Sequence, residues 1–160
     1  MPEPRDPIDV VRAILAAPTD PEIVGRLVAE DATYVSLNYA NPELKKLMPW
    51  CGTGHGPNGI VDTFAKVGRF WRADAFEFLD VFGSGENVAV FGRFTYTSTK
   101  IGRSVTTPFA ILAKVKDGRL TFMQFMEDTF ATAMSFRTRG VWHFESDPEG
   151  GEVTVGAEDA

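Results

Sequence analysis

The feature that most limits the fold is a run of four strand-like segments in the second half of the chain. Residues 75–82, 88–99, 104–116 and 119–128 are rich in β-branched and aromatic residues, and short turn sequences such as Lys116-Asp117-Gly118 separate them. Because short turns join antiparallel neighbours, these segments predict a meander. The apolar face of such a sheet has to pack on helices or on a second sheet.

The first half of the chain supplies those helices. Asp6-Pro7 and Asp20-Pro21 each combine a capping side chain with a proline in the first turn, and apolar residues at helical spacing follow. The other expected elements, in chain order, are a strand at 32–38, a long irregular stretch at 39–56, a third helix after Gly56 and a short helix at 129–136.

This order predicts one α+β domain over residues 1–138. A strongly curved antiparallel sheet that wraps around the helices gives every apolar face a partner, and it leaves an internal pocket in a cone-shaped molecule. Residues 139–160 are expected to form a C-terminal hairpin or a flexible acidic tail.

The composition argues against several classes of partner. Sixteen Lys and Arg against 22 Asp and Glu give a net charge of −6, which disfavours nucleic acids and anionic membranes. One cysteine and two histidines without ligand spacing predict no metal site, and we expect no cofactor. Without a basic start followed by an apolar run, we expect no signal peptide, and the default expectation is a cytoplasmic location.

Four short sequence motifs add a resemblance to a known superfamily. Residues 56–60 (GPNGI), 108–110 (PFA), 116–120 (KDGRL) and 127–130 (EDTF) occur in the same order of elements. Together they resemble the nuclear transport factor 2-like superfamily, in particular its bacterial SnoaL-like branch, which is related to ketosteroid isomerase and limonene epoxide hydrolase. The resemblance implies a cone with a deep, mostly apolar pocket and a homodimer formed through the sheet.

Strand alternation alone leaves open which face of the sheet lines the pocket. The resemblance to limonene epoxide hydrolase implies a face with Asn38, Arg93 and Asp128 as catalytic residues. Asp128 would act as acid or base, because an apolar cavity raises the pKa of a carboxyl group, although Arg93 nearby would lower it. The substrate-binding residues expected with them are Tyr34, Ser36, Trp50, Phe64, Phe91, Thr95, Gln124 and Met126.

The departures from the relatives' patterns narrow the expected chemistry. Thr95 stands where limonene epoxide hydrolase has a second Asp, so epoxide hydrolysis lacks its acid. Asn38 stands where ketosteroid isomerase needs a base. The prediction is therefore a cofactor-independent enzyme of isomerase, cyclase or hydratase type, acting on a small hydrophobic molecule. The alternative is a noncatalytic ligand-binding or dimerisation domain of the same fold.

Each expected catalytic residue also has a structural interpretation. Asp128 fits the N-cap of the helix at 129–136, and Asn38 fits a cap at the start of the irregular stretch. Arg93 fits a structural ion pair with Asp128 or Glu127. For each of these residues, the sequence alone leaves both the catalytic and the structural interpretation open.

Overall fold

The computed structural model describes residues 6–156 and begins with helices and ends with strands. In chain order the elements are α1 (Pro7–Ala16), α2 (Pro21–Leu27), β1 (Val28–Ser36), α3 (Pro42–Leu47), β2 (Gly52–His55), α4 (Gly56–Phe70), β3 (Trp71–Ser84), β4 (Asn87–Ser98), β5 (Ser104–Lys116), β6 (Arg119–Glu127), α5 (Thr129–Met134), β7 (Trp142–Phe144) and β8 (Val153–Val155).

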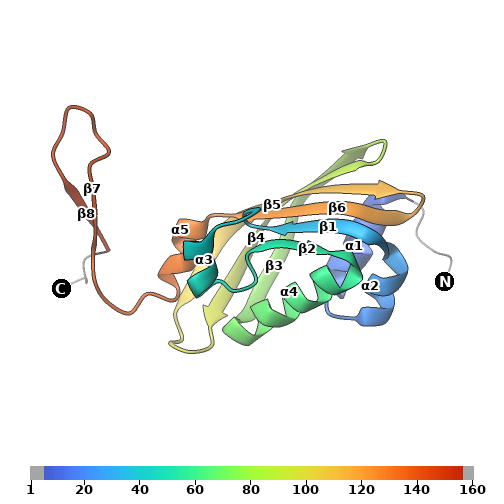
Figure 1. Ribbon diagram of the computed structural model, residues 1–160, viewed down its shortest axis with the longest axis horizontal. Coiled ribbons are helices and arrows are strands. Elements are labelled where there is room, and N and C mark those ends of the chain that lie inside the picture. The colour runs from blue at the N-terminus through green and yellow to red at the C-terminus, as the bar shows by residue number, and fades with distance from the viewer. Residues whose placement is uncertain (1–5, 157–160) are drawn as a thin grey trace.

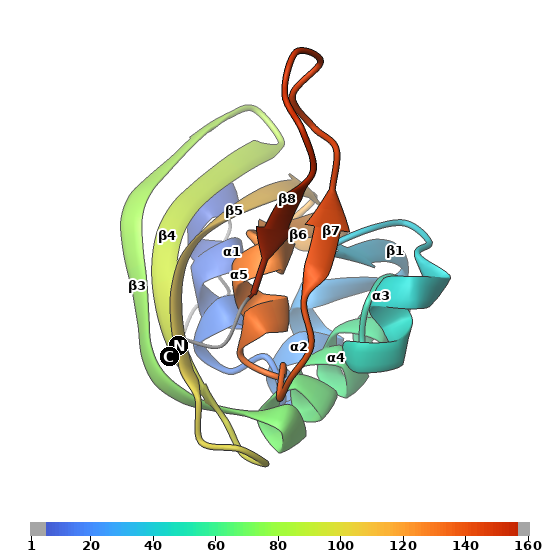
Figure 2. The same ribbon diagram turned by 90° about the vertical axis from the view of Figure 1, so that its left-hand side faces the viewer.

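Six of the strands form one sheet in the order β2-β1-β6-β5-β4-β3. All neighbours are antiparallel except β1 and β6, which are parallel. The sheet is strongly curved: β3, β4 and β5 bend around α1 and α5, while α2 and α4 lie across the open side (Figure 2). The expected α+β cone with an antiparallel meander is therefore confirmed.

The helices begin where the capping residues predict. The Asp6 carboxylate accepts a hydrogen bond from the Ile8 amide at 2.8 Å, and the Asp20 carboxylate accepts one from the Glu22 amide at 2.9 Å. A proline occupies the first turn of both helices. These caps satisfy amides that have no partner inside the helix, which fixes where each helix begins.

The stretch at 39–56 is not irregular throughout, which corrects the sequence expectation. Asn41 caps α3 in the same way as the two aspartates, through a 2.9 Å bond from the Leu44 amide. The glycine-rich β2 then pairs with β1, with Ser36 opposite Gly52 and Thr33 opposite His55. Glycine has a low strand propensity, so only the pairing with β1 makes this segment a strand.

Two strands begin earlier than expected. β1 starts at Val28 directly after α2, and β3 starts at Trp71 directly after α4. No glycine, proline or polar turn marks either change from helix to strand, so the sequence contains no signal for these boundaries.

The alternating burial of residues along β4 shows which face of the sheet points inward. Val88, Val90, Phe94 and Tyr96 are buried. Gly92 shares this face because the Phe109 ring fills the space where a side chain would lie: a Cβ atom at Gly92 would come within 2.2 Å of the ring. The even-numbered residues of β4 therefore face the helices, and the odd-numbered ones face outward.

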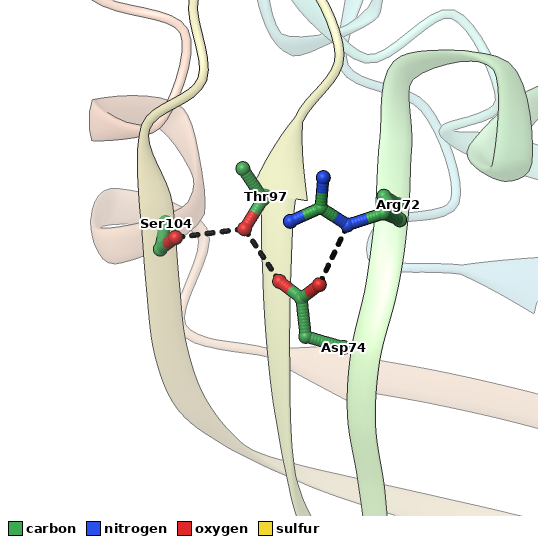
Figure 3. A network of polar contacts seen from close by, with 4 residues as sticks. All are labelled: Arg72, Asp74, Thr97 and Ser104. Carbon is green, nitrogen blue, oxygen red and sulfur yellow. Dashed lines mark hydrogen bonds and ion pairs between the residues drawn. The ribbon is translucent and has the colours of Figure 1, made fainter.

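A polar network ties β3, β4 and β5 together near their ends (Figure 3). The Asp74 carboxylate accepts hydrogen bonds from Thr97 at 2.5 Å and from Arg72 at 2.7 Å, and the Thr97 hydroxyl lies 2.7 Å from that of Ser104. The bond from Thr97 and then that from Arg72 lower the pKa of Asp74. These four side chains connect neighbouring strands and do not line the cavity described below.

The tail forms a hairpin that projects from the body of the molecule (Figure 1). In it Trp142 pairs with Val155 and Phe144 with Val153. The Trp142 ring meets the Phe130 ring of α5 edge-on at 5.4 Å. The proposed boundary after residue 138 remains a prediction.

Candidate active site

A small cavity of about 20 Å³ lies between the inward face of the sheet and α4. Residues from β1, α4, β3, β4, β6 and the segment before β2 form its wall. They are mostly aromatic or aliphatic: Tyr34, Ser36, Leu37, Trp50, Phe64, Val67, Trp71, Tyr96, Phe125 and Glu127. This volume has room for about one water molecule, so the binding of an organic molecule requires side chains of the wall to move.

The aromatic rings of the wall pack against one another. Tyr34 stacks on Phe64 at 6.1 Å between centroids, and Trp50 meets Trp71 edge-on at 4.9 Å. The Trp71 indole donates a 2.9 Å hydrogen bond to the Ser135 hydroxyl, so its polar edge has a partner outside the cavity. The wall is therefore a packed apolar surface with few polar atoms.

Glu127, the last residue of β6, is the acidic residue of this wall. Its Oε1 atom is buried and has no hydrogen-bond partner within residues 6–156. Burial raises the pKa of Glu127 to about 8; the Thr132 hydroxyl lowers it in part and the negative charge of Asp128 raises it. The carboxyl group is therefore mainly protonated at pH 7, which suits a proton donor.

Three hydroxyl groups complete the polar part of the wall. Burial raises the pKa of Tyr96 to about 12 and raises that of Tyr34 as well, so both phenols keep their protons at neutral pH. Ser36 is buried on β1, two residues along from Tyr34 on the same face. Together with Glu127, these hydroxyls can donate hydrogen bonds to an oxygen atom of a bound molecule.

Asp128 does not face the cavity, which corrects the expected placement. Its carboxylate accepts a 3.1 Å hydrogen bond from the Ala131 amide and caps α5, and the residue is exposed. β6 ends one residue earlier, and from Met123 onward its odd-numbered residues point inward. The carboxyl group in the cavity therefore belongs to the neighbouring Glu127, and the capping interpretation of Asp128 is the one that the structure shows.

The structure also separates Asn38 and Arg93 from the cavity. The Asn38 side chain is exposed and accepts a 3.1 Å hydrogen bond from the Ala40 amide, as a cap. Arg93 lies on the outward face of β4, where it forms a 2.6 Å ion pair with Glu77. The expectation that Asn38, Arg93 and Asp128 meet in one cavity is therefore wrong.

The expected substrate-binding residues divide into two groups by the face on which they lie. Four line the cavity: Tyr34, Ser36, Trp50 and Phe64. The others, Phe91, Thr95, Gln124 and Met126, lie on the outward face of the sheet. Here the Thr95 hydroxyl lies 2.9 Å from that of Thr106, and Phe91 stacks on Phe82 at 6.2 Å.

Sequence reasoning missed Glu127, Tyr96 and Trp71. A signal for two of them was present in the strand pattern. On β4 the apolar Phe94 and Tyr96 alternate with polar residues, and on β6 Phe125 shares its face with Glu127. An inward face chosen by this alternation would have included Tyr96 and Glu127.

Two further properties concern only residues 6–156. Within this range, no group of three or more His, Cys, Asp and Glu residues is arranged to hold a metal ion. No helix in it is long and apolar enough to cross a membrane.

Comparison with known proteins identifies the family. Residues 11–123 match the SnoaL-like domain. The chain belongs to the SnoaL-like domain family. A crystal structure of a nuclear transport factor 2-like protein from Burkholderia thailandensis is similar to this SnoaL-like chain in fold: the TM-score is 0.71 at 22% identity, over 84% of this chain and 100% of the other.

Two fungal proteins are similar to this SnoaL-like chain in sequence. Patulin synthesis protein F from Aspergillus clavatus is 40% identical over 94% of this chain and 79% of its own length. Patulin biosynthesis cluster protein F from Penicillium expansum is 39% identical over 92% and 77%. The expectation of a specifically bacterial branch is therefore not supported. Family and relatives together support an enzymatic role on small molecules in general.

Proposed function

We propose that this chain is a cofactor-independent enzyme that moves a proton within a small hydrophobic molecule, with Glu127 as acid and base. The observation that carries the proposal is that Glu127 lines the aromatic cavity and has a buried Oε1 atom without a hydrogen-bond partner among residues 6–156. The names of the fungal relatives, which refer to patulin synthesis, agree with action on a small organic molecule.

The proposed reaction needs only the groups of the cavity wall. Protonated Glu127 donates its proton to the carbonyl oxygen or to a carbon of the substrate. The resulting carboxylate then removes a proton from a carbon next to the carbonyl group, which returns Glu127 to its starting state. Nothing is oxidised or reduced, and the product is an isomer of the substrate; the same steps can serve ring closure.

The phenols of Tyr34 and Tyr96 support this reaction. Both remain protonated, so either can donate a hydrogen bond to the oxygen on which negative charge develops. The rings of Trp50 and Trp71 limit access of water, which strengthens these bonds and keeps the pKa of Glu127 high.

Deuterium exchange tests the proposal without knowledge of the natural substrate. A panel of small cyclic ketones, enones and quinones is incubated with the protein in D₂O, and deuterium next to the carbonyl group is measured by mass spectrometry. We expect the wild-type protein to exceed the buffer rate on at least one compound. Glu127→Gln is expected to lose about 10²- to 10⁴-fold of this rate, because the amide cannot exchange a proton.

Asp128→Asn is the matched control, since it alters the adjacent carboxyl group outside the cavity. This variant is expected to retain most of the exchange rate. Equal rates for the wild type and Glu127→Gln would exclude the proposed role of Glu127. Exchange at the buffer rate by the wild-type protein, with compounds bound, would instead favour a noncatalytic ligand-binding domain.

A second proposal concerns the outward face of the sheet, which we propose is covered by a second copy of this chain. Four large apolar side chains are exposed on neighbouring positions of its strands: Phe82, Phe91, Leu112 and Met126. Phe91 is 49% exposed and lies directly across from Ala110, which in turn pairs with Met126. Soluble monomers rarely leave such a contiguous apolar surface open.

We expect the wild-type protein to be dimeric in analytical ultracentrifugation at micromolar concentration. Phe91→Glu should shift it to a monomer, because two buried and unpaired carboxylates would face each other across the interface. Tyr39→Glu, at a position that is also exposed but lies after β1, is the control and should stay dimeric. A wild-type protein that stays monomeric at high concentration would contradict this prediction.

A further inference from the structure

A second, larger hollow of about 490 Å³ lies at the end of the molecule near α3, α5 and the turn between β4 and β5. We call it the end groove. The end of α3, the end of α4, the turn between β4 and β5 and the segment after α5 surround it. Its lining residues are Lys46, Leu47, Arg69, Phe70, Thr99, Lys100, Ile101, Phe136 and Thr138.

The end groove combines apolar surface with positive charge. Leu47, Phe70, Ile101 and Phe136 supply the apolar surface, and the rings of Phe70 and Phe136 meet edge-on at 6.2 Å. The charged side chains in the lining are two lysines and one arginine, without an acidic residue. The chain as a whole has a net charge of −6, so a groove whose charged lining residues are all positive differs from the rest of the molecule.

Two of these positively charged side chains, Arg69 and Lys100, form no ion pair within residues 6–156. Lys46 forms a 2.7 Å ion pair with Glu43, whereas no carboxylate of residues 6–156 lies within 4.0 Å of the charged nitrogens of Arg69 or Lys100. A structural role for Arg69 would be to bind the free carbonyl groups at the end of α4.

Three carbonyl groups at the end of α4, those of Val67, Arg69 and Phe70, already have donors. The Thr99 hydroxyl donates to the Arg69 carbonyl at 2.8 Å, and the Thr99 amide donates to the Phe70 carbonyl at 2.8 Å. The guanidinium group of Arg69 is therefore not required there. It remains available to an anionic group in the end groove.

The end groove is separated from the cavity by one layer of aromatic rings. Trp50, which lines the cavity, meets Phe70 of the end groove at 5.3 Å and Phe136 at 6.4 Å. Trp71, on the same side, stacks on Phe136 at 4.8 Å. A molecule held in the end groove would therefore lie next to the wall of the proposed active site.

We propose that the end groove binds an organic anion with a ring system. The rings of the ligand would pack on Phe70 and Phe136, and its carboxylate or another acidic group would pair with Arg69 and Lys100. The inference goes beyond the proposed function, because it assigns a second binding site next to the wall of the proposed active site. Binding itself does not depend on Glu127.

Two dyes with the same ring skeleton test the proposal. 1-Anilinonaphthalene-8-sulfonate carries a negative charge, and N-phenyl-1-naphthylamine is its neutral counterpart; both become fluorescent on apolar surfaces. The double variant Arg69→Gln/Lys100→Gln is expected to weaken binding of the sulfonate by about tenfold and to change binding of the neutral dye less than twofold. Added NaCl should weaken sulfonate binding by the wild-type protein more than by this variant.

Lys114→Gln/Lys116→Gln removes two exposed charges from β5 and is the matched control, with the same change in net charge. It should bind both dyes like the wild type. Equal loss of sulfonate binding in both double variants, or no loss in either, would overturn the proposal. Glu127→Gln should still bind the sulfonate normally. If it does, but neither the wild type nor any variant exchanges deuterium above the buffer rate, the proposed reaction is wrong and the proposed binding in the end groove still stands.

Discussion

The wild-type protein should become less stable as the pH rises from 5 to 8, and the Glu127→Gln variant should lose less stability over the same range. Burial raises the pKa of Glu127 from 4.5 to about 8 in the folded protein, whereas in the unfolded chain the group is exposed. Between these two values the folded state holds a proton that the unfolded state has released. Stability therefore falls with rising pH, by at most about 1.4 kcal/mol per pH unit, and levels off above the folded pKa.

The measurement is the free energy of unfolding in urea at several pH values from 5 to 9. The quantity to compare is the difference between the wild type and Glu127→Gln, because other titrating groups cancel in it. We expect this difference to change by a few kcal/mol across the range in favour of the variant. Asp128→Asn should stay close to the wild-type slope, because burial, and not the charge of Asp128, is the main cause of the raised pKa of Glu127. Parallel curves for wild type and Glu127→Gln would show that Glu127 titrates normally.

Much of the fold follows from local signals in the sequence. Asp6 and Asp20 mark the starts of α1 and α2, and the turn at 116–118 marks the hairpin between β5 and β6. Such signals act over a few residues, so they can be read without knowledge of tertiary contacts. The four strands of the meander and their order were predicted for this reason.

The candidate site was only partly predictable, because its residues depend on which of the two faces of the sheet points inward. Consecutive strand residues point to opposite faces, so a wrong choice of face replaces Glu127 by Asp128 and Tyr96 by Thr95. The resemblance to limonene epoxide hydrolase favoured the face with Arg93, while the alternation of apolar residues favoured the other. In the structure Arg93 pairs with Glu77 on the outward face, so the inward face is the one that the apolar alternation favoured and not the one that the resemblance implied.

Trp50 lines the cavity as expected, but the sequence did not predict the contacts that hold it there. Local sequence placed it in the irregular stretch expected at 39–56. In the structure α3 precedes it and β2 follows it, and the ring is buried against Phe70 and Trp71. These contacts join segments about twenty residues apart, so no local pattern encodes them.

The second large effect is expected for Gly92→Ala, which should destabilise the protein by about 3 kcal/mol. A Cβ atom at this position would lie 2.2 Å from the Phe109 ring and 2.4 Å from the backbone carbonyl oxygen of Glu77. The ring cannot move freely, because it stacks on Phe76 at 4.5 Å and on Phe125 at 5.2 Å. The backbone of β3 would have to shift as well, and this is why even a single methyl group is costly.

Thermal unfolding followed by circular dichroism measures this effect, and the expected loss corresponds to roughly 10 °C in the midpoint. Gly68→Ala is the matched control: its new methyl group would meet no atom within 4 Å, on an exposed position of α4. That variant should be more stable than wild type by about 0.5–1 kcal/mol, since alanine favours helix. An unchanged midpoint for Gly92→Ala would show that the stack of rings on the inward face of the sheet is looser than these distances indicate.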